Sequence, residues 1–178
     1  MVSSAVKKYA ALCIVCLCSS LFFLGLYQFN NKYSQDTIQA ANGILALSEE
    51  ELQKSPVRFL VSGWAFYPDA LLTPEEIRDE NHYMRYLSIG AQTNFSSPAN
   101  PSPYGCGTYQ MTFFLPERKE AYALEIPEVF SAYNLYLDHD LILQMGEPAQ
   151  GTPLVQNRMV TFHGGKPVTL TIAVSNYD

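Results

Sequence analysis

The chain has 178 residues, of which 48% are hydrophobic, 13% are aromatic and 16% are charged. This length fits one ordinary domain with an appendage and argues against two full-sized domains. The 17 acidic residues outnumber the 11 basic residues, which gives a formal net charge of −6. This balance excludes the positive surface of a nucleic-acid-binding protein, so we expect no nucleic-acid partner. The sequence also lacks a glycine-rich phosphate loop, paired CxxC motifs and HExxH, and it predicts no cofactor.

An apolar run without charged residues extends from Tyr9 to Phe29. As a helix, this run would span roughly 30 Å, which is enough to cross the core of a bilayer. Lys7 and Lys8 directly precede it, and basic residues favour the cytoplasmic side. We therefore expect residues 1–8 to be cytoplasmic, residues 9–29 to be a single-pass signal anchor in the cell membrane, and the remainder to be extracellular. A cleaved signal peptide is the alternative, although its apolar region is usually only about 7–15 residues long.

Cysteine usage agrees with this layout. Three of the four cysteines lie inside the apolar run, where cysteine behaves as a small hydrophobic residue. The part after the run contains only Cys106, so it cannot form an internal disulfide. We interpret residues 30–42 as a juxtamembrane stalk, and we expect the domain that follows to be stabilised by its core.

Two short helices are predicted from capping boxes, in which Ser or Thr precedes Glu by three residues. The two pairs are Ser48 with Glu51 and Thr73 with Glu76. Pro74 follows the second cap at the first helical position, where proline is favoured. The expected helices lie within residues 47–54 and 73–80.

Most of the remaining chain alternates between apolar and other residues, as β-strands do. In one strand, Tyr109, Met111 and Phe113 fall on one face. The expected strands are 58–68, 84–90, 107–117, 120–128, 131–140, 140–146, 157–163 and 168–176. We interpret Asp138-His139-Asp140 as a turn and not as a metal site, because adjacent residues rarely converge on one ion. Many short strands about ten residues apart predict an all-β sandwich.

The order of the motifs after residue 42 resembles that of one family. The motifs are GILAL (43–47), GWAFY (63–67), GCGTYQMTFFLP (105–116), ALEIP (123–127), SAYNLYL (131–137) and LTIAVSN (170–176). They resemble the galactose-binding-like jelly roll that forms the extracellular sensor domain of bacterial DISM-type receptors, which are seven-transmembrane receptors with diverse intracellular signalling modules, and of related sensor histidine kinases. The resemblance covers residues 43–178.

This resemblance implies a jelly-roll β-sandwich that senses a small molecule or a carbohydrate. The same jelly roll resembles the sugar-binding domains attached to β-galactosidase-like hydrolases. The chain departs from the receptor family in two places. The family usually carries Asn-Gly in the hairpin where this chain has Asp138-His139-Asp140, and its members continue into membrane helices and a kinase or cyclase, whereas this sequence ends at Asp178. We therefore expect the domain 43–178 to be truncated at its C-terminus and the chain not to be an enzyme.

Two segments supply candidate ligand-binding residues. The loop 93–105 is rich in Pro, Ser and Asn, and it offers Asn94, Asn100 and Tyr104, whose amide and hydroxyl groups suit sugar hydroxyls. A solvated linker is the competing interpretation of this loop. Trp64 has a ring that could stack on a sugar, although the burial habits of such a strand favour a core position for it.

Taken together, these patterns predict a membrane-anchored extracellular sensor or ligand-binding domain of a bacterial signalling receptor, with no catalysis of its own. Its expected partners are an unidentified small molecule or carbohydrate, the membrane, and a partner receptor or a second copy of the chain. Two alternatives stay open, namely a carbohydrate-binding module of a glycoside hydrolase and a surface adhesion or assembly domain.

Overall fold

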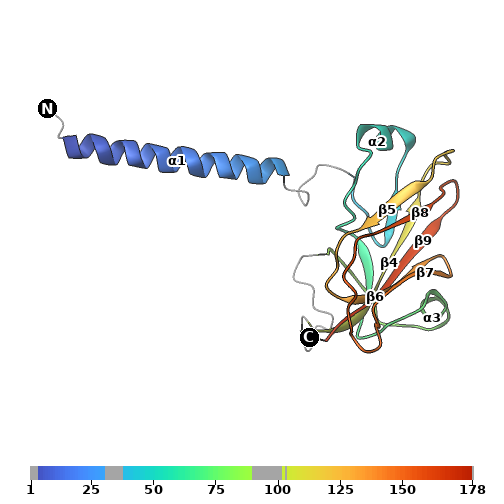
Figure 1. Ribbon diagram of the computed structural model, residues 1–178. Helices are drawn as coiled ribbons and strands as arrows, with labels where there is room; N and C mark the ends of the chain where they lie inside the picture. Colours follow the sequence, from blue (N-terminus) through green and yellow to red (C-terminus); the bar gives the residue numbers. More distant parts are fainter. Residues whose placement is uncertain (1–3, 31–37, 90–101, 103, 178) are drawn as a thin grey trace. The chain divides into compact units, whose positions relative to one another are not determined.

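The computed structural model describes residues 4–30, 38–89, 102 and 104–177. The chain divides between Thr37 and Ile38 into two compact units. The first unit contains a long helix, and the second contains two packed β-sheets (Figure 1).

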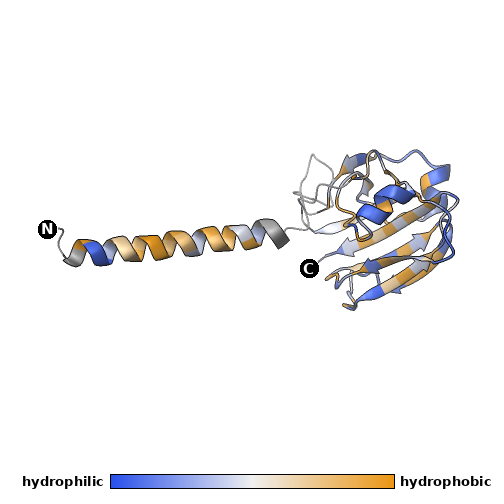
Figure 2. Cartoon of the chain, turned by 90° about the horizontal axis from the view of Figure 1, so that it is seen from above, coloured by the Kyte–Doolittle hydropathy of each residue, from blue (hydrophilic) through white to orange (hydrophobic). Residues whose placement is uncertain are grey.

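The helix of the first unit, α1, extends from Ser4 to Asn30. Its segment Val6–Tyr27 is long and apolar enough to cross a membrane. Figure 2 shows hydrophobic colouring along most of this helix and hydrophilic colouring near its N-terminal end, where Lys7 and Lys8 lie. The predicted apolar helix is therefore confirmed. A signal sequence near the N-terminus can also be long and apolar enough to meet this criterion, so anchoring and orientation stay predictions.

The second unit is a mostly antiparallel β-sandwich, as the sequence predicts. Its strands are β1 (Ile44–Ala46), β2 (Trp64–Pro68), β3 (Arg85–Leu87), β4 (Gly105–Phe114), β5 (Tyr122–Ile126), β6 (Ala132–Leu137), β7 (Asp140–Met145), β8 (Arg158–Phe162) and β9 (Val168–Asn176). The large sheet has the order β3-β2-β4-β9-β6-β7, and β1 pairs in parallel with the end of β4. The small sheet consists of β5 and β8.

The core lies on the inner face of the large sheet, against the small sheet. Met111 and Phe113 point from β4 into this core, and Leu170 and Val168 lie opposite them on β9. Phe162 of the small sheet stacks on Phe113 with ring centroids 5.7 Å apart. The predicted alternation of residues 107–117 is thus confirmed, and burial of these large side chains is the main stabilising contribution.

Both predicted helices are present, each with a complete capping box. They are α2 (Glu49–Lys54), capped by Ser48, and α3 (Pro74–Asp79), capped by Thr73. At α3, the Thr73 hydroxyl accepts from the Glu76 backbone N–H, and the Glu76 carboxylate accepts from the Thr73 backbone N–H. Most residues of the two helices are hydrophilic, whereas Leu52 of α2 and Pro74 of α3 are buried.

The strand expected over residues 58–68 is shorter than predicted, because β2 begins only at Trp64. Gly63 interrupts the extended backbone with a φ of +79°, a conformation that favours glycine. Before it, the Arg58 guanidinium donates to the backbone carbonyl of Glu51 over 2.8 Å. Residues 58–63 are therefore not part of the strand, and Arg58 is instead bonded to α2.

Candidate ligand-binding cleft

A cleft of about 480 Å³ lies on the outer face of the large sheet. Its floor comes from β4 and β9, and its walls come from α3, the β6–β7 turn and the segment before β9. The lining residues are Pro74, Ile77, Arg78, Gln110, Thr112, Asp138, His139, Pro167 and Thr169. The volume is within the usual range for small-ligand sites, about 300–1,000 Å³.

The floor presents hydroxyl and amide groups from two adjacent strands. Thr112 pairs with Thr169, and Gln110 pairs with Thr171, in the antiparallel register of β4 and β9. The hydroxyl oxygens of Thr112 and Thr169 lie 3.1 Å apart. The Gln110 amide Nε2 donates to the Thr171 hydroxyl over 3.2 Å. The floor therefore carries polar groups that are held in place by strand pairing.

The wall formed by α3 is attached to the same strand through Thr108, which is fully buried. The Thr108 hydroxyl accepts from the backbone N–H of Leu72 and donates to the backbone carbonyl of Ala70, both over 2.8 Å. These bonds fix the chain just before the Thr73 cap. Pro74 and Ile77 then give this wall an apolar surface toward the cleft.

The opposite wall is the two-residue turn Asp138-His139, which joins β6 to β7 as predicted. Asp138 has a φ of +54°, the left-handed conformation that Asn or Gly often adopts in such hairpins. Its backbone N–H donates to the Thr169 carbonyl over 2.7 Å, and its carboxylate accepts from the Thr169 N–H over 2.8 Å. Among the described residues, no group of three or more His, Cys, Asp or Glu side chains could hold a metal ion.

The two walls meet through Glu75 and His139. The His139 Nδ1 lies 2.9 Å from a Glu75 carboxylate oxygen, although the residues are 64 positions apart in the chain. Glu75 belongs to α3 and His139 to the β6–β7 turn, and both elements are hydrogen-bonded to the floor strands. The Glu75–His139 contact therefore connects the two walls of the cleft.

The charges on the α3 wall are partly balanced within the helix. The Arg78 side chain donates to the Asp79 carboxylate through Nε and Nη2. This hydrogen bond is the main cause of the lowered pKa of Asp79, and it raises the pKa of Arg78. The backbone N–H of Thr73 lowers the pKa of Glu76 by hydrogen bonding to its carboxylate. Both hydrogen bonds thus favour the ionised forms of Asp79 and Glu76.

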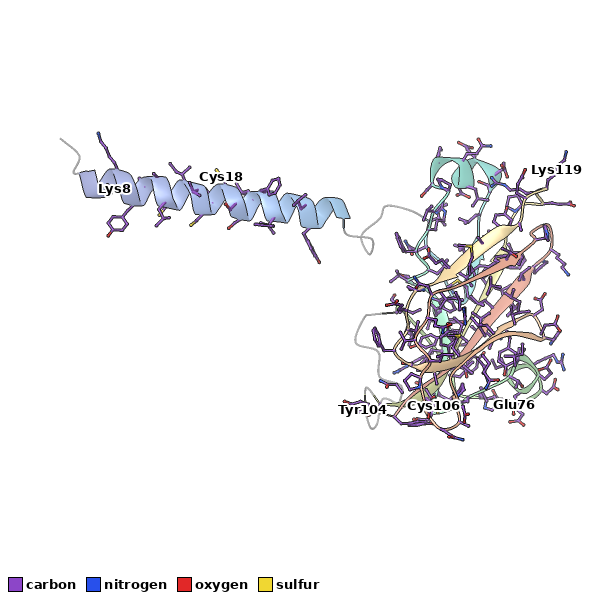
Figure 3. All side chains as sticks on the ribbon, in the orientation of Figure 1. Lys8, Cys18, Glu76, Tyr104, Cys106 and Lys119 are labelled. Atoms are coloured by element: carbon purple, nitrogen blue, oxygen red, sulfur yellow. The ribbon has the colours of Figure 1, made fainter. Side chains whose placement is uncertain are left out.

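The ligand-binding residues predicted in the long loop do not line this cleft. Asn94 and Asn100 lie outside the described residues. Tyr104 is described, just before β4, and its side chain is 54% exposed. Figure 3 labels Tyr104 well apart from Glu76, which marks α3. A binding role for these three residues stays a prediction.

Trp64 is a core residue, as the burial argument favours, and is only 2% exposed. Its Nε1–H donates to the backbone carbonyl of Leu60 over 2.9 Å, and its ring meets Tyr109 edge to face at 6.1 Å. Burial raises the pKa of Tyr109 to about 12, so its hydroxyl is neutral. The structure therefore places Trp64 away from the cleft and on the inner face of the large sheet.

Sequence reasoning missed the cleft because its residues come from four separate segments. The usable signal was the set of polar residues that alternate with core residues on two strands, such as Gln110 and Thr112 on β4 and Thr169 on β9. Polar residues at these positions are also typical of a strand whose outer face is simply exposed to solvent, so the pattern alone does not indicate a site. The register of β4 and β9 and the position of α3 turn them into the floor of a cleft.

No known family model matches the chain, and no curated protein matches it. Solved structures are similar over part of the chain. A β-glucuronidase from Faecalibacterium prausnitzii aligns with 18% identity and a TM-score of 0.47, covering 63% of this chain and 20% of that one. A β-glucuronidase from Ruminococcus gnavus in complex with D-glucaro 1,5-lactone aligns with 12% identity and a TM-score of 0.43, covering 76% and 24%.

A β-glucosidase from Kluyveromyces marxianus in complex with glucose aligns with 15% identity and a TM-score of 0.38, covering 62% of this chain and 14% of that one. This chain thus spans about a fifth of the length of the first solved structure above. Similarity at this level supports no statement about the substrate or the catalysis of this chain.

Proposed function

We propose that this chain is a non-catalytic binding domain for a small carbohydrate-like ligand, and that the cleft on the outer face of the large sheet is its binding site. The observation that supports this proposal is the polar floor made by Gln110, Thr112 and Thr169 beside the apolar surface of Pro74, Ile77 and Pro167. A sugar has hydroxyl groups that need donors and acceptors, and C–H surfaces that favour apolar contact. The cleft offers both kinds of surface within about 480 Å³.

The rigidity of the floor favours binding by a preformed site. Thr112 and Thr169 belong to the longest strand pair of the sheet, with nine paired positions between β4 and β9. Thr108 and Asp138 attach the two walls to this floor through hydrogen bonds. A site on such elements loses little conformational freedom when a ligand binds, which favours affinity.

We further propose that the domain is anchored in the cell membrane by α1 and faces the outside of the cell. Lys7 and Lys8 directly before the uncharged run Tyr9–Phe29 support this orientation, because basic residues favour the cytoplasmic side. The motif resemblance supports a sensor role in a bacterial signalling receptor. In that role the output would come from a partner receptor, from a second copy or from further sequence.

The test uses the full chain in detergent micelles and four neutral monosaccharides: D-galactose, D-glucose, D-mannose and N-acetyl-D-glucosamine. Titration calorimetry should detect binding of at least one of them. Gln110→Ala and Thr112→Val should weaken this binding, because each removes a polar group from the floor. Thr161→Val is the matched control, since Thr161 is exposed on β8 and does not line the cleft.

Binding that is unchanged in both cleft variants would move the site elsewhere in the chain. The absence of binding to all four sugars at millimolar concentration would overturn the carbohydrate proposal.

A further inference from the structure

We propose that Glu75 holds the ring of His139 in the tautomer that carries its proton on Nδ1, so that Nε2 accepts a hydrogen bond from a ligand hydroxyl. This inference rests on the proposed function of the cleft. It assigns His139 as a ligand-binding residue and Glu75 as the residue that positions it.

The tautomer follows from the geometry of the pair. The His139 Nδ1 lies 2.9 Å from the Glu75 Oε1, within hydrogen-bond distance. An ionised carboxylate only accepts hydrogen bonds, so the proton between these atoms belongs to Nδ1. In a neutral imidazole the other nitrogen then carries a lone pair and accepts. The Glu75 contact therefore decides which chemical group His139 offers at Nε2.

The position of His139 makes this group relevant to a ligand. His139 lines the cleft, and its Nε2 has no hydrogen-bond partner among the described residues. The turn that contains His139 is held on the floor strand, because the preceding residue, Asp138, makes two hydrogen bonds to Thr169. Glu75 is fixed by α3, whose cap follows the segment bonded to Thr108. Both partners are thus held by the sheet.

A second acceptor on the floor matches this one. The Gln110 amide uses Nε2 to donate to Thr171, which leaves its Oε1 for another contact. His139 and Gln110 together would therefore select a ligand that donates from two hydroxyl groups. A deoxy sugar that lacks one of these hydroxyls would leave an acceptor without a partner and bind more weakly.

A purely structural tie is the competing explanation for the pair. The His139 side chain is 61% exposed and the Glu75 side chain is 47% exposed. Exposed ion pairs contribute little to folding stability, because water screens them and both side chains lose freedom. A positioning role accounts better for the contact. Such a role requires only that the contact places the ring proton on Nδ1, and it does not require a large contribution to folding stability.

The first part of the test is spectroscopic and needs no ligand. The full chain, labelled with ¹⁵N at its three histidines, is studied in detergent micelles by NMR at a pH where the ring is neutral. The ring nitrogen shifts of His139 should report the Nδ1–H form. Glu75→Ala should shift the ring toward the other tautomer, whereas Glu75→Gln should keep it, because its amide oxygen still accepts from Nδ1.

The second part measures selectivity with the tightest-binding of the four monosaccharides and its monodeoxy derivatives. In the wild type, two derivatives should each bind about three- to tenfold more weakly than the parent sugar, one for each acceptor, the loss expected for one neutral hydrogen bond. His139→Ala should reduce one of these two ratios to about one and leave the other unchanged, and Glu75→Ala should reduce the same ratio in part. His163→Ala is the control, since His163 is exposed and does not line the cleft.

An Nε2–H form in the wild type would overturn the inference, as would an unchanged selectivity in His139→Ala. If His139→Ala binds like the wild type while Gln110→Ala loses binding, the inference fails and the cleft stays the site. If none of the four sugars binds, the proposed function fails together with the inference.

Discussion

Thr112 and Thr169 face each other across β4 and β9, with their hydroxyl oxygens 3.1 Å apart. Both side chains point to the outer face of the sheet, because their neighbours along the strands, Met111 and Leu170, belong to the core. Valine at these positions would have the same shape and a similar preference for strands. The hydroxyl pair therefore supplies polarity to the floor of the cleft without altering the strand.

The threonine pair gives a first prediction. Thr169→Val should change the free energy of unfolding by less than about 1 kcal/mol, because the side chain keeps its shape and loses one half-exposed hydrogen bond. The same variant should weaken binding of a neutral monosaccharide by about three- to tenfold. Denaturant unfolding and titration calorimetry on the full chain measure the two effects. An equal loss of stability and affinity would instead indicate a damaged sheet.

Trp64 gives the second prediction. Trp64→Ala should lower the free energy of unfolding by about 3–5 kcal/mol, because it removes a large core side chain and leaves a cavity. This loss is a large fraction of the stability of an ordinary domain. Phe130→Ala is the control, because Phe130 is 75% exposed and its removal should cost less than about 0.5 kcal/mol. A well-folded Trp64→Ala variant that no longer binds sugar would move the site to β2.

Local patterns in the sequence were enough to predict most elements of the sandwich. The capping boxes at Ser48 and Thr73 specify two helix starts by contacts three residues apart. The alternation of Tyr109, Met111 and Phe113 specifies which face of β4 enters the core. Gly63 suggests a bend in the sequence, but the local pattern does not show that its backbone has a φ of +79° and lies close to the backbone of Ala40.

The cleft depends on contacts between distant parts of the chain, and local patterns do not encode these. Glu75 and His139 are 64 residues apart, and Thr112 and Thr169 are 57 apart. The local pattern places Glu75 in the first turn of a capped helix and His139 in a polar turn. Both interpretations are correct for the local structure. The joint role becomes visible only when the strand order places β4 between β2 and β9.

The two glycines before β1 and β2 give a third prediction. Gly63→Ala should destabilise the domain by on the order of 3 kcal/mol or more, because its Cβ would lie 2.1 Å from the carbonyl oxygen of Ala40. Gly43→Ala is the matched control, with a similar φ of +74° and only ordinary contacts for the added Cβ. It should cost about 1–2 kcal/mol, the strain of the left-handed conformation alone. Equal losses for both would show that the close approach is relieved by a shift of Ala40.

The cap of α3 gives a fourth prediction, which concerns pH. The hydrogen bond from the Thr73 backbone N–H holds the pKa of Glu76 below its ordinary value of 4.5. A lowered pKa in the folded state adds stability that is fully present above the unfolded pKa and is lost as the pH falls through the folded one. Thermal unfolding should therefore separate the wild type from Glu76→Gln above about pH 5. The gap should shrink toward pH 3, and a constant gap would contradict a role for the charge.

Membrane orientation gives the last prediction. Because Lys7 and Lys8 directly precede the uncharged run Tyr9–Phe29, we expect them to stay in the cytoplasm and the β-sandwich to be exported. In bacterial cells, alkaline phosphatase fused after Asp178 should be active, because it folds only in the exported compartment, and a fluorescent protein that folds only in the cytoplasm should stay dark. Replacing both lysines with glutamate and adding two lysines after Phe29 should weaken or reverse this pattern. Strong cytoplasmic fluorescence of the unmodified fusion would place the domain, and its cleft, on the inner side of the membrane.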